Sequence, residues 1–203
     1  MSNGSKIALG VVGAVLLVVL ITGSWGIGSY NKLITLDQET QKQWGQVENA
    51  YQRRADLVPN LVATVKGAAK FEQDTLTAVT EARAKVGQVN LGPGTVNDPA
   101  AFQRFQQAQD GLSSALSHMM VVMEKYPELK ATEGFRDLQA QLEGTENRIS
   151  QERRLFNEAA QNFNATRESF PTTIVAGFFG SKFKDKEFFK ATTGADKPPE
   201  VKF

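Results

Sequence analysis

An uncharged apolar segment near the N-terminus is the feature that most constrains this chain. It runs over Ile7–Gly28, 22 residues without a charged side chain. An α-helix needs about 20 apolar residues to cross the hydrocarbon core of a bilayer, so the segment is long enough for one crossing. Eleven of the fifteen residues from Ile7 to Ile21 are Leu, Ile or Val. Together these residues favour insertion by about 3–7 kcal/mol, and the sequence therefore predicts one membrane-spanning helix.

We expect this segment to be retained as an anchor rather than removed as a signal peptide. Its apolar stretch is long for a signal peptide, and no Ala-x-Ala cleavage pattern follows it. The stretch Leu20–Ser24 resembles a lipobox, but Ser24 stands where the lipidated cysteine is required. Interfacial aromatic residues are typical of the ends of membrane helices. The expected anchor residues include Ile7, Leu16, Leu17, Leu20 and, at the membrane surface, Trp25.

The composition of the chain excludes several classes of function. There is no cysteine, which rules out disulfides, thiol catalysis, Cys-ligated zinc and iron–sulfur clusters. The single histidine, His118, leaves almost no material for a His-based metal site or a catalytic triad. Lys and Arg number 23 against 22 Asp and Glu, so no strong basic field attracts nucleic acid. We expect no cofactor and no nucleic-acid partner.

Beyond Tyr30 the apolar residues recur at helical spacing, with gaps of three, four and seven residues. No sustained alternation of period two is present, so a sheet is not expected. We predict an all-α chain in which an N-terminal transmembrane helix is followed by a long antiparallel four-helix bundle. The apolar positions of the four predicted helices run over Leu33–Tyr51, Leu61–Val86, Phe102–Met123 and Phe135–Phe170. The expected division is a membrane anchor (1–29), a helical bundle (30–170) and an aromatic C-terminal tail (171–203).

Capping residues and prolines predict where these helices begin and end. Asp98-Pro99 is an N-cap followed by proline at the first helical position, which starts the third helix. Tyr126-Pro127 ends that helix, because the residue before proline is disfavoured in the α region. The chemistry of Asn90–Gly94 predicts a loop. From Leu142 to Phe170 in the fourth helix the apolar step is seven each time, the spacing of a coiled-coil seam.

The stretch around Pro59 has two interpretations. Asp56 three residues earlier is a good N-cap and proline is tolerated in a first turn, so a new helix can begin there. Alternatively, Pro59 kinks one continuous helix. The first two helices then form a single rod that continues the membrane helix.

No constellation of residues predicts catalysis or metal binding. On the third helix His118 lies about 130° from the centre of the apolar stripe, and it therefore points away from the core. Position 115 is Ala, so the Glu-x-x-His pair of di-iron bundles is absent. The carboxylates of Glu143 and Glu146 suit a solvated helix face.

Two groups of residues are candidates for an interaction surface. Arg53, Arg54 and Asp56 form a charged patch near the end of a predicted helix, and Asn60 follows them. Such a patch can dock a partner, or it can reflect local ion pairing of Arg53 with Asp56.

The second group is the aromatic tail, which holds six of the thirteen phenylalanines: Phe178, Phe179, Phe183, Phe188, Phe189 and Phe203. Lysines are interleaved with the first five. A disordered tail is typically poor in aromatic residues, so we expect these rings to be buried against a surface. The candidates are the chain's own bundle, a neighbouring subunit and the anionic membrane surface. We favour a protein surface, because the last seven residues are neither strongly basic nor amphipathic.

Many short stretches of this chain resemble the LemA family. In chain order they are Tyr30–Asp37, Trp44–Asn49, Arg53–Leu61, Val65–Gly67, Thr80–Arg83, Tyr126-Pro127, Leu142–Arg148, Asn162–Asn164, Phe170-Pro171 and Phe188-Phe189. The resemblance covers nearly the whole of the chain beyond the apolar segment.

The resemblance implies a bacterial single-pass protein of the inner membrane with a long helical bundle and no agreed catalytic residues. It also implies a cytoplasmic bundle, which the charges leave open because Lys6 is opposed by Lys32 and Lys42. Relatives that share genome context with membrane zinc proteases suggest a membrane protease system as a partner. We expect a non-enzymatic, membrane-anchored scaffold or adaptor that forms a homo-oligomer or docks a membrane partner. The alternatives are a hydrolase that uses acidic residues and a binder of small apolar ligands between the helices.

Overall fold

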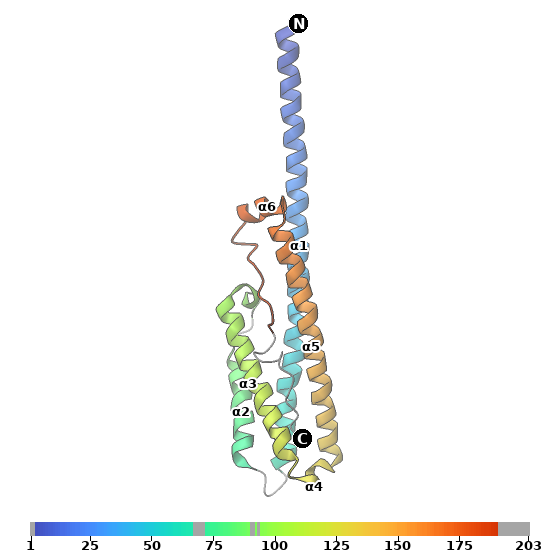
Figure 1. Ribbon diagram of the computed structural model, residues 1–203, viewed down its shortest axis with the longest axis vertical. Coiled ribbons are helices and arrows are strands. Elements are labelled where there is room, and N and C mark those ends of the chain that lie inside the picture. The colour runs from blue at the N-terminus through green and yellow to red at the C-terminus, as the bar shows by residue number, and fades with distance from the viewer. Residues whose placement is uncertain (1–2, 67–71, 90–91, 93, 191–203) are drawn as a thin grey trace, which may run out of the picture.

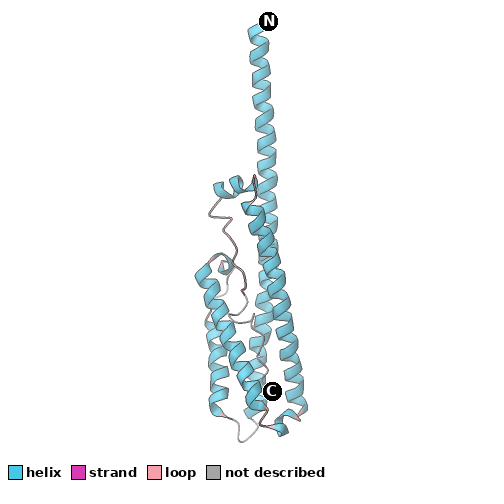
Figure 2. Ribbon diagram, in the orientation of Figure 1, coloured by secondary structure: helices cyan, strands magenta, loops and turns pink. Residues whose placement is uncertain are grey.

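The computed structural model describes residues 3–66, 72–89, 92 and 94–190. In these residues the chain forms helices, turns and extended segments, and no strand. The elements are α1 (Asn3–Lys66), α2 (Gln73–Gln88), the 3₁₀-helix η1 (Thr95–Asn97), α3 (Pro99–Met123), α4 (Pro127–Lys130), α5 (Glu133–Glu168) and α6 (Thr172–Phe178). The predicted all-α fold is confirmed, and Figure 2 shows the helices and the loops that join them.

The four long helices form an antiparallel bundle. Figure 1 shows α1 descending from the N-terminus, α2 rising, α3 descending and α5 rising again beside α1. The apolar part of α1 projects beyond the bundle. Helices α2 and α3 reach only part of the way up α1 and α5, and α6 lies across the upper end. The bundle therefore has four helices in its lower half and two long helices above it.

The projecting part of α1 has the character expected of the anchor. An 18-residue window in it has a mean hydropathy of 2.6 and is not buried against any other part of the chain. By length and composition, α1 can cross a membrane. The expected anchor residues are all exposed, Leu20 at 71% and Trp25 at 36%, with Ile7, Leu16 and Leu17 between them.

Of the two interpretations of the stretch around Pro59, the one in which a new helix begins at Asp56 is wrong. Helix α1 is continuous through Pro59 to Lys66, and the next helix begins at Gln73. The alternative interpretation, one rod that continues the membrane helix, describes α1. The predicted second helix, Leu61–Val86, does not form one element. Its first residues belong to the end of α1, and its last residues belong to α2.

A hydrogen bond from α2 explains how α1 tolerates Pro59. Proline has no N–H, so it leaves the carbonyl of Ala55 without its usual partner in the helix. The Nε–H of Arg83 on α2 donates to that carbonyl at 2.9 Å. A neighbouring helix thus satisfies the orphan acceptor, and the backbone can continue as a helix.

The other predicted boundaries agree more closely with the structure. Asp98 caps α3, and its carboxylate accepts hydrogen bonds from the N–H groups of Ala100 and Ala101 at 2.9 and 3.2 Å. Helix α3 ends at Met123, just before the Tyr126-Pro127 pair, and His118 is exposed on it as predicted. The short helices η1, α4 and α6 were not predicted. Of the predicted loop, only Gly92 and Gly94 lie within the described residues.

The seven-residue apolar step of α5 holds only as far as Phe163. Leu142, Ile149, Phe156 and Phe163 are buried, at 6% exposure or less. Phe170 is 81% exposed, because the helix ends at Glu168 and the chain turns away. The predicted seam is therefore wrong at its last position.

Two cores fill the bundle. The distal core, in the four-helix half, is mainly aliphatic and includes Leu57, Leu61, Val65, Leu76, Val79, Leu112, Leu116, Met119, Met123 and Leu142. The aromatic core lies above it and includes Trp44, Tyr51, Phe102, Phe105, Phe156 and Phe189. A smaller cluster near α6 contains Leu33, Phe163, Ala176 and Phe183. The last two clusters each include a ring from beyond α6.

Candidate functional site: a groove filled by the C-terminal segment

Residues 183–190, here called the C-terminal segment, lie in a groove of the upper bundle. Figure 1 shows this stretch leaving α6 and descending beside α5 toward α3 and η1. Its burial repeats every three residues: Phe183, Lys186 and Phe189 are 0%, 2% and 7% exposed. Lys184 and Asp185 between them are exposed. A period of three is typical of polyproline II-like chains, in which every third side chain faces the same way.

Two asparagines of α5 hold the backbone of this segment. The Nδ2 of Asn164 donates to the carbonyl of Lys186 at 2.9 Å, and its Oδ1 accepts from the N–H of Lys186 at 2.9 Å. Asn157 makes the same pair of bonds with Phe189, again at 2.9 Å each. An asparagine amide offers one acceptor and two donors, so it can pair with both backbone groups of one residue. This recognition does not depend on the side chains of the segment.

The spacing of the two asparagines matches the spacing of the residues they bind. Asn157 and Asn164 are seven residues apart, which is about 10.5 Å along a helix. Lys186 and Phe189 are three residues apart, which is about 10 Å in an extended chain. The segment therefore stays in register with α5 over this length, and it runs antiparallel to that helix.

Arginines of α5 bind the two ends of the segment. Arg167 donates from Nε to the carbonyl of Phe183 at 2.6 Å and pairs with Asp185 at 2.7 Å. Arg153 donates to the carbonyl of Lys190 at 3.3 Å, and its guanidinium lies 4.6 Å from the centre of the Phe189 ring. One face of α5 thus contacts the segment from its first residue to its last.

The ring of Phe189 completes the aromatic core. Its centre lies 4.9 to 6.4 Å from the ring centres of Trp44, Phe102, Phe105 and Phe156. Each such aromatic pair contributes about 0.5–1.5 kcal/mol beyond the burial of its area. The segment is therefore part of the fold as well as an occupant of the groove.

Lys186 inserts a charge into the interior. Its Nζ pairs with Asp37 of α1, donates to Oδ1 of Asn97 at 2.8 Å, and lies 4.7 Å from the ring centre of Phe163. A buried ammonium group requires such partners because its removal from water is costly. The groove thus accommodates an aromatic ring, a lysine and a second aromatic ring at intervals of three residues.

Arg54 does not belong to an accessible interaction patch, so that prediction is wrong. It is 1% exposed. Its guanidinium donates to Gln109 at 2.6 Å, to Ser113 at 2.5 Å and to Glu146 at 2.9 Å, and it lies 5.0 Å from the ring centre of Tyr51. These bonds join α1 to α3 and α5, which explains why a charged residue occupies the core.

The other members of the charged patch are exposed. Arg53 donates to Gln141 of α5 at 3.1 Å, and Asp56 accepts from Gln52 at 2.8 Å. Asn60 is also exposed, on the next turn of α1. In the described residues, Arg53 and Asp56 therefore bond to other residues rather than to each other.

The phenylalanines of the tail divide into two groups. Phe183 and Phe189 are buried in the chain's own bundle, and Phe188 is half-buried. Phe178 and Phe179 are exposed, at 84% and 40%, and Phe203 lies outside the described residues.

The charged patch and the exposed rings are far apart. Phe179 contacts Tyr30, and Arg53 is 23 residues further along α1, about 35 Å on a straight helix. The two candidate groups therefore form no common surface.

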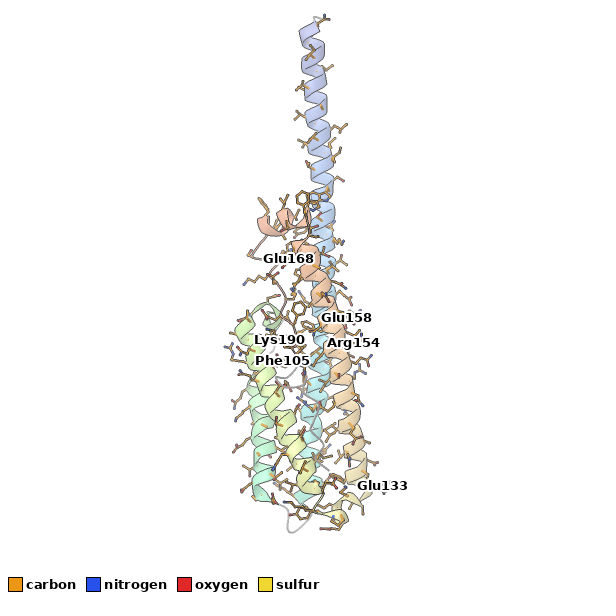
Figure 3. All side chains as sticks on the ribbon, viewed as in Figure 1. Phe105, Glu133, Arg154, Glu158, Glu168 and Lys190 are labelled. Carbon is orange, nitrogen blue, oxygen red and sulfur yellow. The ribbon has the colours of Figure 1, made fainter. Side chains whose placement is uncertain are left out.

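Two further features of the described residues bear on chemistry, an open groove on the surface and two ionisable groups with raised pKa values. They contain no group of three or more His, Cys, Asp or Glu residues that could hold a metal ion. An open groove of about 550 Å³ runs along α5 beside the C-terminal segment, with Arg154, Glu158 and Lys190 in its lining (Figure 3). Burial raises the pKa of the half-buried Glu48 carboxyl. It also raises the pKa of the hydroxyl of Tyr51, which is buried more deeply.

The sequence did not point to the asparagines, Asp37 or Lys186 as site residues. A weak signal was present, since Tyr30–Asp37, Asn162–Asn164 and Phe188-Phe189 all resemble stretches of one family. The structure brings these three stretches together around the C-terminal segment. Their order along the chain does not indicate that the three stretches lie close together in the folded protein.

Comparison with known proteins identifies several relatives. The sequence profile described as the LemA family matches residues 43–203. Magnetosome protein MamQ 2 of Paramagnetospirillum magneticum is 26% identical over an alignment of 187 residues, and the match covers 83% of this chain and 67% of that protein. Magnetosome protein MamQ of Magnetospirillum gryphiswaldense is 25% identical with the same coverage. Protein LemA of Metamycoplasma hominis is 25% identical over 150 residues, 74% of this chain and 64% of that protein.

Proposed function

The chain belongs to the LemA family, and from this premise we propose that it is a membrane-anchored scaffold that acts by self-association rather than by catalysis. In this proposal, copies of the protein exchange their C-terminal segments. Each groove then holds the segment of a neighbouring copy in place of its own.

The observation that carries the proposal is the way in which the groove holds its occupant. The contacts consist of asparagine amides on backbone groups, a ring in an aromatic pocket and a lysine on a carboxylate. None of them depends on the covalent link to α6. The same segment of a second copy presents the same groups, so exchange replaces each contact with an equivalent one.

The anchor favours this exchange. Helix α1 is continuous from the apolar segment into the bundle, so every copy holds its groove at the same height above the membrane. Confinement to one membrane also raises the effective concentration of one copy's segment near another copy's groove. We place the bundle on the cytoplasmic side of the inner membrane, as the family resemblance implies.

Docking of a membrane partner, such as a membrane protease system, is the alternative mode of action. A partner with an extended stretch of the same chemistry would compete with the C-terminal segment for the groove. The two modes differ in what co-purifies with the protein after gentle extraction.

The test is extraction of the full-length protein in a mild detergent, followed by mass measurement. Two differently tagged forms produced in the same cells should co-purify, and the particle mass should exceed that of a monomer. The double variant K186A/F189A should lose co-purification while it keeps its helical circular dichroism. K184A is the matched control, because Lys184 lies on the same segment and is exposed. A wild-type protein that is a monomer with no co-purified partner would contradict the scaffold proposal.

A further inference from the structure

Large apolar side chains are exposed at the end of the bundle nearest the apolar part of α1. Beyond Ile27, the described residues contain five such exposed side chains, and four of them lie within residues 170–179. Phe170, Ile174, Phe178 and Phe179 are 81%, 60%, 84% and 40% exposed. Single exposed apolar residues are ordinary, but a concentrated group marks a surface that contacts something apolar.

Helix α6 turns its largest apolar side chains away from the protein. Phe170 is exposed in the turn that precedes it. Ile174 and Phe178 are spaced by four within α6, so they lie on one side of that helix. On the opposite side Thr172 and Ala176 are 8% and 3% exposed against the bundle. A helix on a water-facing surface has the reverse arrangement, with its apolar face toward the core.

Contacts with α1 set the height of this apolar face. The ring of Phe179 lies 5.0 Å from that of Tyr30, and the Nζ of Lys182 donates to the Tyr30 hydroxyl at 2.6 Å. Tyr30 is two residues beyond Gly28, which is about 3 Å along the helix. Figures 1 and 3 show α6 beside α1 at the end of the bundle closest to the apolar segment. The face therefore lies where α1 leaves the hydrocarbon region.

The charges around the face are mixed but mainly basic. Lys182 and Lys184 follow the exposed rings, and Lys32 is exposed on the adjacent turn of α1. Glu168 is the opposing exposed charge, while Asp185 is paired with Arg167. Aromatic rings with flanking lysines suit the boundary between acyl chains and anionic headgroups.

We infer that Phe170, Ile174, Phe178 and Phe179 insert into the interface of the same lipid bilayer that α1 spans. The bundle is thereby attached to the membrane at two points, the span itself and α6. Two attachments restrict the rotation of the bundle about α1 and its tilt away from the membrane normal. This lipid contact is independent of self-association, and the two proposals can fail separately.

The absence of cysteine from the chain allows a direct test with single-cysteine variants of the full-length protein. I174C and F178C are labelled with the environment-sensitive fluorophore NBD and reconstituted into vesicles of equal parts phosphatidylcholine and phosphatidylglycerol. V121C is the matched control, because Val121 is an apolar side chain of α3 that is 68% exposed at the distant end of the bundle. Lipids that carry a nitroxide group then serve as quenchers.

The labels at positions 174 and 178 should shift their emission to the blue and lose most of it to the nitroxide lipids. The label at position 121 should keep the emission of a fluorophore in water. Equal behaviour of all three labels would overturn the inference. So would labels at 174 and 178 that are shielded from water but not quenched by lipid, since a protein surface would then cover them.

A charged variant provides a second measurement that does not depend on labels within α6. Lipid quenching of a label at F170C should be lost when Ile174 and Phe178 are both replaced by Glu. The same label should remain quenched in the control variant V121E. All four replaced positions are exposed, so the helical circular dichroism should stay unchanged. Quenching at position 170 that survives the double replacement would contradict insertion of α6.

Discussion

The lower and upper halves of the bundle are built on different principles. The lower half is closed by four helices around the distal core, and its buried side chains come from their apolar stripes. The upper half has only α1 and α5 along its full length, and an extended segment lies where further helices would otherwise pack. Backbone groups of that segment are satisfied by asparagine side chains rather than by a helix. The lower half resembles an ordinary bundle, and the upper half resembles a complex between a helix pair and a peptide.

This difference has a physical consequence for how each half responds to change. In the distal core each apolar side chain contacts several others from the surrounding helices. The loss of one contact therefore leaves the others in place. In the upper half a few residues hold the segment through bonds that form or fail together. We therefore expect the upper half to open locally, at a lower free energy than global unfolding requires.

Truncation of one large side chain in each core should lower the free energy of global unfolding. F156A removes a fully buried ring of the aromatic core, and L116A removes a side chain of the distal core that is 7% exposed. We expect losses of about 3–5 and 2–5 kcal/mol in the free energy of unfolding, measured by denaturation in detergent. H118Q is the control on α3 and should change stability by less than about 0.5 kcal/mol. If L116A left stability unchanged while H118Q lowered it, α3 would bury the face that carries His118 instead of the face that carries Leu116.

Arg54 joins the helices near the border of the two cores, and its removal should cost almost as much. R54A should lower the free energy of unfolding by about 3 kcal/mol, because it leaves Gln109 and Glu146 without their buried partner. R54K should not restore stability, since one ammonium cannot reproduce bonds made by both ends of a guanidinium. R53A is the neighbouring control, exposed on the same helix. Equal effects of the two alanine variants would argue against the buried network.

The asparagines should matter for the upper half alone. N157A removes two hydrogen bonds to Phe189, and we expect about 1–3 kcal/mol less protection for the C-terminal segment. Hydrogen exchange of α2 and α3 should change little, since neither helix supplies the lost bonds. N162A changes an exposed position between Asn157 and Asn164, and it should leave the protection of the segment as in the wild type. Loss of protection throughout the bundle in N157A would show that the two halves are one cooperative unit.

Alkaline pH should produce the smallest effect, through Tyr51. Burial raises the pKa of its hydroxyl, and the nearby charges of Arg153 and Arg54 offset part of that rise. The folded protein therefore binds the phenolic proton more tightly than the unfolded chain does. Its contribution to stability is complete below about pH 10 and is lost as the pH rises further, by at most about 1.4 kcal/mol per pH unit. Y51F should lack this component of the alkaline decline, and identical pH profiles would contradict it.

The contrast between the halves also explains how much the sequence could predict. Helical spacing and the Asp98 cap locate α3 and α5, and the seven-residue step from Leu142 to Phe163 predicts the buried face of α5 correctly. These features are local, so a sequence records them directly. The path of α1 through Pro59 depends on Arg83 from another helix, and local rules favour a break there.

The groove was beyond prediction for a related reason. Asn157 and Asn164 lie among polar residues of α5. Nothing in their spacing distinguishes a pair of asparagines that binds a backbone from an ordinary solvated surface. Phe183, Lys186 and Phe189 form a period of three that neither a helix nor a strand template detects. The aromatic composition did predict that the tail rings find a surface, and for Phe183 and Phe189 that surface is the chain's own bundle. Which rings remain exposed depends on where α5 ends and α6 turns.

Residue-resolved hydrogen exchange on the full-length protein in a bilayer can show whether the C-terminal segment is held in its groove like a bound peptide. The N–H groups of Lys186, Glu187 and Phe189 donate to Asn164, to the carbonyl of Val96 and to Asn157. These three should exchange slowly, while those of Lys184 and Asp185, for which the described residues provide no acceptor, should exchange quickly. In N157A the protection of Phe189 should be lost first. Uniformly fast exchange over residues 183–190 in the wild type would mean that the groove does not hold the segment.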